Sequence, residues 1–333
     1  MITTFGERMR SLMTKRGLSL RKLAATVHYD LGYLSKVSRD LKPPSNAMAR
    51  ALDEALAADG ELIALAPVRS RLWRPAGIIT SEDEERLTLA VERPVSVDQN
   101  VLDALATVLA GQRRLEDAIG PAALAIPIGA QLAQLTVMLR ETTGPQRERF
   151  GRIVAEWTCY VGWLYAAVRE DAQAYNYLGR AEELADEFGD GTIAAIATSF
   201  RGYPARQQGR HRAVVRASSA ALATPGGHPS QRIFDLLQAA LGYAALGERE
   251  HARGLLDDAA NRAADAPEPP PAIYWYTPSF FQLYTGMVLG HLGEYRDATD
   301  LLRAGIAGVP ADQRGAEWMR EYEDALTFAQ DRA

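Results

Sequence analysis

The amino-acid sequence predicts an all-α protein in which a small helical domain precedes a longer array of helices. Its 333 residues exceed the roughly 100–200 residues of one typical domain. Apolar residues recur at three- and four-residue spacings, and no segment shows the alternation of a strand. We therefore expect a first domain at residues 1–66, a linker at residues 67–97 and a helical array at residues 98–333.

The composition excludes several classes of protein. Hydrophobic residues make up 47% and charged residues 24% of the chain, so neither bulk disorder nor a membrane-spanning bundle is expected. No run reaches about 18 consecutive apolar residues, and the first residues lack the apolar core of a signal peptide. We expect a cytoplasmic protein without a membrane partner.

The usual signatures of metal sites and enzymes are missing from the sequence. The single cysteine, Cys159, excludes an intrachain disulfide, a multi-cysteine zinc site and a cysteine-ligated iron–sulfur cluster. The five histidines are scattered and form no H-E-x-x-H pair. There is no Gly-rich phosphate loop after a strand and no G-x-S-x-G turn. We expect no metal, no cofactor and no enzymatic activity.

Basic charge is concentrated near the N-terminus. The net charge is −5, but residues 1–70 carry 11 basic and 7 acidic residues, whereas the remainder carries 26 and 35. Between Arg8 and Lys42 the count is 9 basic to 2 acidic, and this span holds all four lysines of the chain. Such a cluster is typical of a phosphate-binding surface, although a solvated basic face has the same composition.

Five short helices are expected in the first domain, because apolar positions recur at helical spacing between capping and breaking residues. Thr4 is suited to cap the first helix and Gly17 to end it, and Ser19 is suited to cap the second. Pro43 and Pro44 prevent the third helix from continuing. The expected helices cover residues 5–13, 20–27, 30–38, 45–56 and 61–66.

The segment GLSLRKLAATVHYDLGYLSKVSRDLKPPS, residues 17–45, resembles the lambda-repressor-like helix-turn-helix of xenobiotic-response-element (XRE) regulators. The matching features are Leu23-Ala24, the run Tyr33-Leu34-Ser35-Lys36, Arg39 and Pro43-Pro44-Ser45. The resemblance implies a five-helix DNA-binding domain whose third helix, residues 30–38, enters the major groove.

Two positions depart from the pattern of that family. The turn position usually held by glycine is His28, where a left-handed conformation would cost on the order of 1 kcal/mol. The acidic position late in the third helix is Ser38, and the site that often supplies its arginine partner is Met13. Because both members of this buried pair are replaced together, the fold assignment is not weakened.

The predicted DNA-binding residues come from the outward face of the third helix and from its basic flanks. Leu34 and Val37 are expected to pack inward, which leaves Ser35 and Lys36 to bond bases or phosphate. Leu31 offers an apolar surface for a thymine methyl, unless it packs against a neighbouring helix. Basic residues at the flanks suit phosphate contacts. The full set is Arg21, Asp30, Leu31, Gly32, Ser35, Lys36, Arg39 and Lys42.

An internal repeat follows two apolar stripes at residues 101–109 and 132–139, which predict helices. Tetratricopeptide units place small residues, a tyrosine, a glycine and a large residue at offsets of about 0, 3, 7, 12, 16 and 19. Starts at Ala240 and Gly286 match well, Gly162 has an arginine at offset 7, and Gly202 matches more weakly. The starts are 40, 38 and 46 residues apart, so connections longer than usual are expected.

This half of the chain resembles the tetratricopeptide-like C-terminal domains fused to XRE modules in GC-rich bacteria, most clearly in GWLYAAVREDAQAYNYLGRAEELA, residues 162–185. The resemblance implies an α-solenoid whose first helices line a concave partner site for a peptide or small molecule. Arg206 is expected to pair with a ligand carboxylate and the rings to stack on the ligand, although the same positions suit core packing. The candidates are Glu156, Trp163, Tyr203, Arg206, Phe234, Phe280, Met287 and His291. A further aromatic cluster at residues 274–284 suits a lid, a dimer surface or ordinary core.

The sequence therefore predicts a homodimeric transcription regulator that binds a near-palindromic operator in double-stranded DNA and senses a peptide or small molecule. The alternative is a protein-interaction adaptor, in which the repeats dock a protein partner and the helix-turn-helix does not read DNA sequence. The salt dependence of DNA affinity separates the two hypotheses, because phosphate contacts release counterions.

Overall fold

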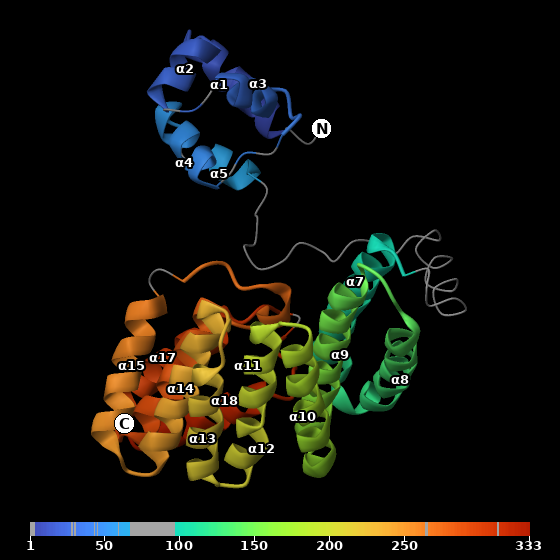
Figure 1. Cartoon of the computed structure of the whole chain (residues 1–333). Coiled ribbons are helices and arrows are strands. Elements are labelled where there is room, and N and C mark those ends of the chain that lie inside the picture. Colours follow the sequence, from blue (N-terminus) through green and yellow to red (C-terminus); the bar gives the residue numbers. More distant parts are fainter. Residues whose placement is uncertain are drawn as a thin grey trace. The chain divides into compact units, whose positions relative to one another are not determined.

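The computed structural model describes residues 4–27, 29, 31–42, 44, 46–58, 60–66, 97–263, 266–311 and 313–333. Within these residues all regular structure is helical, so the predicted all-α class is confirmed. The chain divides into two compact units, Met1–Trp73 and Arg74–Ala333, which are described separately (Figure 1). Apart from Val97, the predicted linker at residues 67–97 lies outside the described residues. No helix in the described part of the chain is long and apolar enough to cross a membrane.

Short helices packed around one apolar core form the N-terminal unit. They are α1 (Phe5–Lys15), α2 (Leu20–Thr26), α3 (Leu31–Ser38), α4 (Asn46–Ala55) and α5 (Glu61–Leu65). Thr4 caps α1 through a capping box with Glu7, and Ser19 caps α2 by accepting a hydrogen bond from the Lys22 N–H (3.2 Å). The fully buried core residues include Met9, Leu23, Leu34, Leu52 and Leu62.

The turn after α3 is tied to the start of α1. The Asp40 carboxylate accepts hydrogen bonds from the Thr4 hydroxyl (2.7 Å) and from the Gly6 N–H (2.8 Å). A Cβ on Gly6 would lie 2.6 Å from the Asp40 carboxylate and 2.7 Å from the Ser38 carbonyl oxygen, so only glycine fits there. The Arg10 guanidinium donates to the same carbonyl. These contacts fix α3 against α1.

These contacts lie where the sequence pattern of XRE regulators has a buried ion pair. Ser38 is buried and its hydroxyl donates to the Ser35 carbonyl (3.0 Å), while Met13 packs in the apolar core. Arg10 and Asp40 supply the polar contacts instead, and the sequence analysis did not single out either residue.

A second carboxylate organises the turn between α4 and α5. Asp53 is buried and accepts hydrogen bonds from the N–H groups of Gly60 (2.8 Å) and Leu62 (2.9 Å). The first N–H groups of a helix have no intrahelical partner, so Asp53 caps α5 from the preceding helix. A helix as short as α5 is not stable alone and depends on this cap and on the burial of Leu62.

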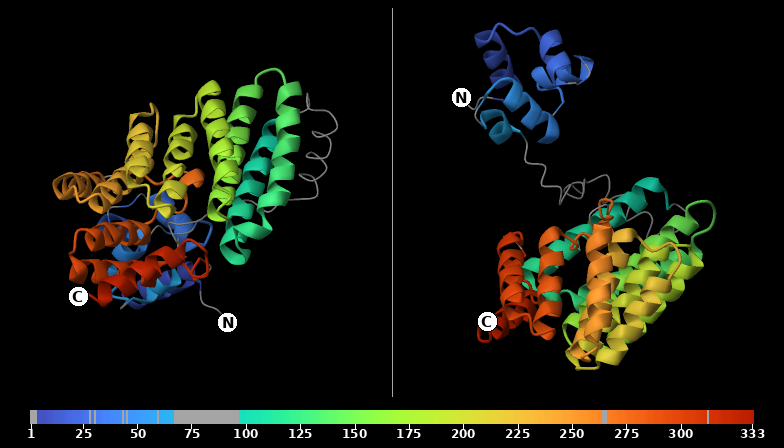
Figure 2. Two further views of the ribbon diagram at one scale, coloured as in Figure 1. Left: turned by 90° about the horizontal axis from the view of Figure 1, so that it is seen from below. Right: turned by 90° about the vertical axis from the view of Figure 1, so that its left-hand side faces the viewer.

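The C-terminal unit is a repeat-like array of helices along a curved path (Figures 1 and 2). The helices pair in sequence: α9 packs on α10, α11 and α12 on α13, α14 on α15, and α16 on α17, with α18 against the last pair. The elements are α7 (Gln99–Ile119), η2 (Pro121–Ala123), α8 (Ala125–Glu141), α9 (Arg147–Ala167), α10 (Asp171–Glu187), α11 (Gly191–Phe200), α12 (Gly202–Gln207), α13 (His211–Ala223), α14 (Pro229–Ala245), α15 (Arg249–Ala263), η3 (Pro271–Ile273), α16 (Pro278–His291), α17 (Tyr295–Gly308) and α18 (Met319–Gln330).

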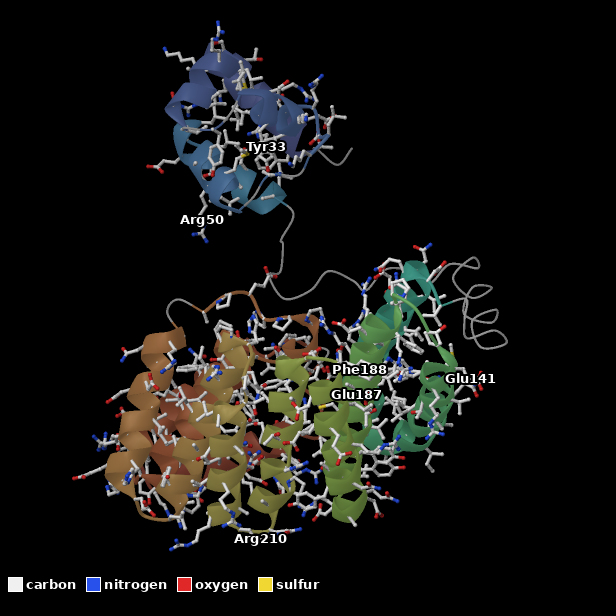
Figure 3. The ribbon with its side chains drawn as sticks, in the orientation of Figure 1. Tyr33, Arg50, Glu141, Glu187, Phe188 and Arg210 are labelled. Atoms are coloured by element: carbon white, nitrogen blue, oxygen red, sulfur yellow. The ribbon has the colours of Figure 1, made fainter. Side chains whose placement is uncertain are left out.

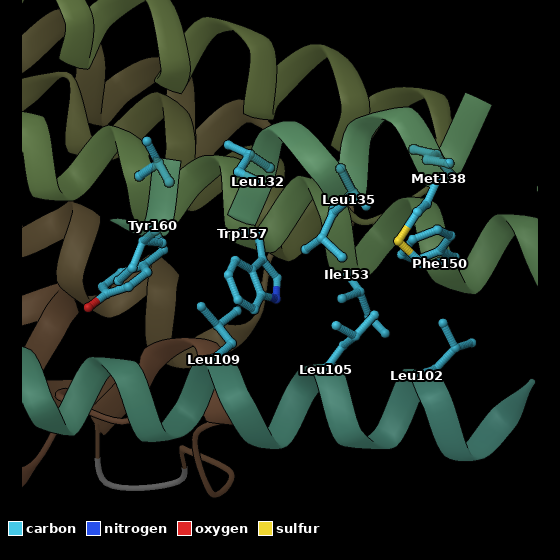
Figure 4. Packing of buried hydrophobic residues seen from close by; sticks show 14 of the residues in the cluster. Leu102, Leu105, Leu109, Leu132, Leu135, Met138, Phe150, Ile153, Trp157 and Tyr160 are labelled. Atoms are coloured by element: carbon cyan, nitrogen blue, oxygen red, sulfur yellow. The ribbon is translucent and has the colours of Figure 1, made fainter. Parts of the chain in front are cut away.

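Helices α7, α8 and α9 enclose the first apolar core of this unit. Leu102, Leu105 and Leu109 follow one face of α7, and they point toward Ile153 and Trp157 of α9 (Figure 4). Burying side chains of this size contributes about 1.5–3 kcal/mol each. The residues from α8 that complete the cluster include Leu132, Leu135 and Met138.

Close contacts at glycine bring the later helices together in pairs. A Cβ on Gly162 in α9 would lie 2.8 Å from the Leu178 side chain in α10. A Cβ on Gly286 in α16 would lie 2.7 Å from the Leu302 side chain in α17. These residues occupy the first and fifth positions of the repeat unit found in the sequence, so the repeat marks the contacts between paired helices.

The turn inside each pair contains a residue in the left-handed conformation. This conformation costs a non-glycine residue roughly 1–2 kcal/mol, and glycine holds the position in three of the four pairs. The four residues are Arg169 (φ 67°), Gly209 (φ 67°), Gly247 (φ 80°) and Gly293 (φ 80°).

We expect Gly247→Ala to lower the free energy of unfolding by about 1 kcal/mol, because the added Cβ is strained by the backbone conformation. It meets no atom within 4 Å, so steric overlap does not contribute. Gly254→Ala is the matched control, since Gly254 is equally open but lies inside α15, where alanine is more stable by roughly 0.5–1 kcal/mol. Urea denaturation measures both effects, and two changes of the same sign would contradict this explanation.

Candidate functional site

Helix α3 presents one face of the N-terminal unit to solvent. Leu34 and Val37 are buried, whereas Gly32 and Lys36 on the other side are exposed. Leu31 is 38% exposed, so it keeps an accessible apolar surface instead of packing fully against a neighbouring helix. The face therefore combines an ammonium group with an apolar side chain.

Two basic residues after α3 are held against this face. Arg39 donates from Nε to the Ser35 carbonyl oxygen (3.1 Å) and from Nη2 to the Ser35 hydroxyl oxygen (3.2 Å). The Ser35 hydroxyl accepts this bond and keeps its own hydrogen for donation. Lys42 Nζ lies 4.6 Å from the centre of the Tyr33 ring, within the range of a cation–π contact. Both Arg39 and Lys42 remain exposed, so positive charge borders α3.

The remaining predicted DNA-binding residues lie near the same helix in sequence. Arg21 is exposed in the first turn of α2. Asp30 and the turn residue His28 lie outside the described residues. An exposed helix of this size, with hydroxyl and ammonium donors and an apolar group, matches what the major groove of DNA admits.

A cavity of about 100 Å³ lies inside the C-terminal unit. Its wall is formed by the first helices of successive pairs, by α7 and α18, and by the segment that precedes α16. The ring centre of Trp163 is 5.3 Å from that of Phe200 and 5.0 Å from that of Tyr203. The ring of Trp275 is 4.9 Å from that of Phe234. Aromatic surface therefore dominates the wall.

The two arginines of this wall are each paired with a carboxylate. Arg113 Nη1 lies 2.7 Å from Glu156 Oε1. Arg206 donates from Nε (2.7 Å) and Nη2 (2.8 Å) to the two carboxylate oxygens of Glu321, and it also bonds the Tyr284 hydroxyl. From the sequence, Arg206 was predicted to pair with a ligand carboxylate. The structure instead supplies that carboxylate from α18 of the same chain.

Glu116 is a carboxylate of the wall whose pKa lies near neutral pH. Burial raises the pKa of Glu116 from 4.5 to about 7, and the charge of Asp117 adds to the rise. A hydrogen bond from the Trp163 indole N–H (2.7 Å) acts in the opposite direction. Glu116 is therefore partly protonated at neutral pH. The charged and titratable groups that face it are Arg113 and Asp117 from α7, Tyr160 from α9 and Tyr274 from the segment before α16.

The structure gathers part of the predicted ligand-binding set at this cavity. Glu156 lies behind the wall as the partner of Arg113. Met287 is buried in the apolar core, and His291 is exposed at the end of α16. The predicted residues that line the cavity are Trp163, Tyr203, Arg206, Phe234 and Phe280.

The contribution of α7 to the wall was not predicted from the sequence. Arg113 and Glu116 continue the stripe of Leu105 and Leu109 along the same helix. Charged residues at the spacing of a buried apolar face are the signal that identifies them, because such groups need polar partners inside the protein. A second group that was not predicted comes from α18 and the residue before it, which no repeat match covers: Trp318, Glu321 and Tyr322.

The segment between α15 and α16 also reaches the cavity. It runs back across the ends of the helices and contains η3 (Figure 1). Tyr274 and Trp275 from this segment line the cavity, and the Tyr274 hydroxyl lies 3.5 Å from Asp117. Of the three roles expected for the aromatic cluster at residues 274–284, the structure shows core packing, because Tyr276 and Tyr284 are buried and Trp275, Phe280 and Phe281 pack against the same apolar cluster.

Cys159 lines the cavity as an unreactive group. Burial raises the pKa of its thiol to about 12, so the thiol stays protonated at neutral pH. Within the part of the chain that the structure describes, no three His, Cys, Asp or Glu side chains are grouped to hold a metal ion.

We expect Glu116→Gln to remove one component of the pH dependence of stability. The unfolded chain releases the Glu116 proton near pH 4.5 and the folded protein near pH 7, so this residue lowers stability as the pH rises through that interval. The full effect is about 3 kcal/mol. Urea denaturation at pH 5 and pH 8 measures the free energy of unfolding of both proteins. Relative to the wild type, the variant should therefore be more stable at pH 8 than at pH 5. Glu187→Gln, an exposed residue at the end of α10 (Figure 3), is the control that should show no such shift.

The helical part of the N-terminal unit corresponds to a known family. Residues 4–66 match a family model described as "Helix-turn-helix domain", and this range spans α1 to α5. The chain has no match among curated proteins or solved structures. Together with the exposed face of α3 and its basic flanks, the match identifies residues 4–66 as a helix-turn-helix DNA-binding domain.

Proposed function

We propose that the protein is a transcription regulator of the XRE type that reads DNA sequence through α3. The observation that carries this proposal is the exposed α3 face inside a matched helix-turn-helix domain. Ser35 and Lys36 offer donors to the acceptor-rich edge of guanine, and Leu31 suits a thymine methyl. The basic residues that border α3 suit phosphate contacts, which position the domain without reading sequence.

The proposed sensor is the C-terminal array, which we interpret as tetratricopeptide-like. Its repeat positions coincide with the contacts between paired helices, and its first helices surround a ring-lined cavity. A cavity of about 100 Å³ favours a small molecule over an extended peptide. A ligand that binds one arrangement of the array more tightly than another shifts the population toward it, and this couples binding to DNA affinity.

We propose further that the regulator acts as a homodimer on a near-palindromic operator, with half-sites about 34–36 Å apart. Apolar side chains that the C-terminal unit leaves exposed support a protein contact there. Ile119 at the end of α7 is 53% exposed, and Ile126 at the start of α8 is 79% exposed. A protein contact that covers such side chains would remove apolar surface from water and so be stabilising.

No catalytic step, metal or cofactor enters this proposal. The cavity thiol is protonated and both arginines of the wall are already paired with carboxylates. A regulator of bacterial DNA works in the cytoplasm, and we place the protein there.

Selection of genomic DNA tests the reading of sequence by α3. We expect the purified protein to enrich a few near-palindromic fragments, and Ser35→Ala with Lys36→Ala to lose or change them, because each good side-chain contact to a base is worth about 1–3 kcal/mol. Sequencing of the recovered fragments is the measurement. Lys15→Ala, an exposed lysine at the end of α1, controls for the loss of charge. Featureless recovery that is identical in all three proteins would favour the adaptor hypothesis.

The dependence of affinity on salt tests the phosphate contacts. We expect affinity for an enriched fragment to fall steeply between about 50 and 200 mM salt, and Lys42→Ala to reduce the slope of log affinity against log salt by about one. Fluorescence anisotropy at several salt concentrations gives the slope. Lys15→Ala should leave it unchanged, and an equal reduction by both variants would place Lys42 outside the interface.

A further inference from the structure

The wall of the cavity carries more carboxylates than guanidinium groups. Glu116, Asp117 and Glu321 line it together with two arginines. One of those arginines is neutralised by Glu321, and the other by Glu156 behind the wall. Among the residues that the structure describes, an anionic ligand would therefore find both arginines of the wall already paired, and it would lie close to Glu116.

Glu116 is buried where an ionised carboxylate is poorly stabilised. Its side chain belongs to a residue only 6% exposed, and the rise of its pKa to about 7 has burial as its first cause and Asp117 as a further one. Of the charges around Glu116, that of Asp117 acts more strongly than that of Arg113. A positive charge placed beside Glu116 would compensate for both the lost solvation and the repulsion.

Trp163 joins this carboxylate to the aromatic part of the wall. Its indole N–H donates to Glu116, and its ring contacts those of Phe200 and Tyr203. The faces of indole and phenol rings attract cations, and the attraction is stronger where water is excluded. Flat aromatic walls also bury the apolar body of a ligand. The carboxylate of Glu116 and the aromatic wall thus both favour a ligand with a positive charge and an apolar body.

We propose that the cavity binds a small organic cation, with its ammonium or guanidinium group beside Glu116 and its apolar body against the rings of Trp163, Phe200 and Trp275. The inference deepens the sensor role proposed above, on which its regulatory meaning rests. It names the ligand class that the wall recognises.

Binding of such a cation is linked to the release of a proton from Glu116. The cation stabilises the ionised carboxylate, so binding competes with protonation and affinity increases as the pH rises. With a pKa of about 7, the ionised fraction of Glu116 increases about tenfold between pH 6 and pH 8. Above pH 8 the affinity levels off.

Three probes of similar shape and different charge test the proposal on the full chain. They are 2-phenylethylamine, 2-phenylethanol and phenylacetate, whose single ring suits a cavity of about 100 Å³, and the measurement is isothermal titration calorimetry at pH 6 and pH 8. The amine should bind most tightly and the carboxylate most weakly, and the affinity for the amine should be up to about tenfold higher at pH 8. Equal affinities for the three probes, tightest binding of the anion, or no binding of the amine at millimolar concentration would overturn the proposal.

Variants assign the effect to Glu116. Glu116→Gln should weaken the amine about tenfold at pH 8 and abolish the pH dependence, whereas Glu187→Gln should change neither. Calorimetric titration of the wild-type protein with the amine in two buffers of different ionisation enthalpy gives the number of protons released on binding. This measurement needs no variant, so it tests the role of Glu116 even if Glu116→Gln fails to fold. A proton release of zero at pH 7 contradicts the proposed site.

DNA binding is measured separately, so the two proposals fail in different ways. Amine binding without any change in affinity for the enriched fragment supports the cation site and refutes its sensor role. If the protein binds specific DNA but does not bind the amine, the proposed regulator function is supported and the cation site is refuted.

Discussion

The contact between a glycine in one helix and a leucine in the next sets the geometry of the C-terminal unit. At Gly162 and Gly286 the paired backbones approach so closely that no Cβ fits. The residue after such a glycine points in a different direction around the helix, since successive residues are about 100° apart. Trp163 follows Gly162, and Tyr203 follows Gly202 in the same way. In α9 and α12, close packing on one side of the helix thereby directs a large aromatic group toward the cavity on another side, whereas the residue after Gly286 is Met287, which is buried in the apolar core.

In the N-terminal domain, hydrogen bonds fix the position of one helix against another. Its third helix is short, and a recognition helix is useful only if it is held rigidly. Asp40 and Arg10 hold the end of α3 on the start of α1, and Gly6 makes the approach possible. The exposed face of α3, which we propose reads DNA, therefore owes its position to contacts between the end of α3 and α1.

Local pattern predicted the helices and most of the turns, because helix spacing, caps and prolines act within a few residues. The small residues of the repeat likewise predicted which helices pair. The cavity was only partly predictable. Trp163 and Tyr203 belong to repeat units, but Arg113 and Glu116 acquire their role through contacts with residues far along the chain. Sequence spacing carries no information about such distant partners.

The partner of Arg206 was also not predictable from the sequence. Its position toward the inside was expected from the repeat, but its partner, Glu321, lies in a helix outside every repeat match. A buried arginine needs a carboxylate, and the sequence alone did not reveal whether the ligand or the chain supplies it.

The contacts at the cavity also join the two ends of the array. Gln313 donates to Asp117 across 196 residues of sequence, and Arg206 bonds Glu321 across 115. In an open solenoid each repeat touches only its neighbours, so terminal repeats fray and the array folds piece by piece. Here α7 is bonded to the segment between α17 and α18, and α12 is bonded to α18, and such long-range bonds make the fold more cooperative. That cooperativity has a kinetic cost, because long segments of chain must be ordered before these bonds form, and folding is correspondingly slow.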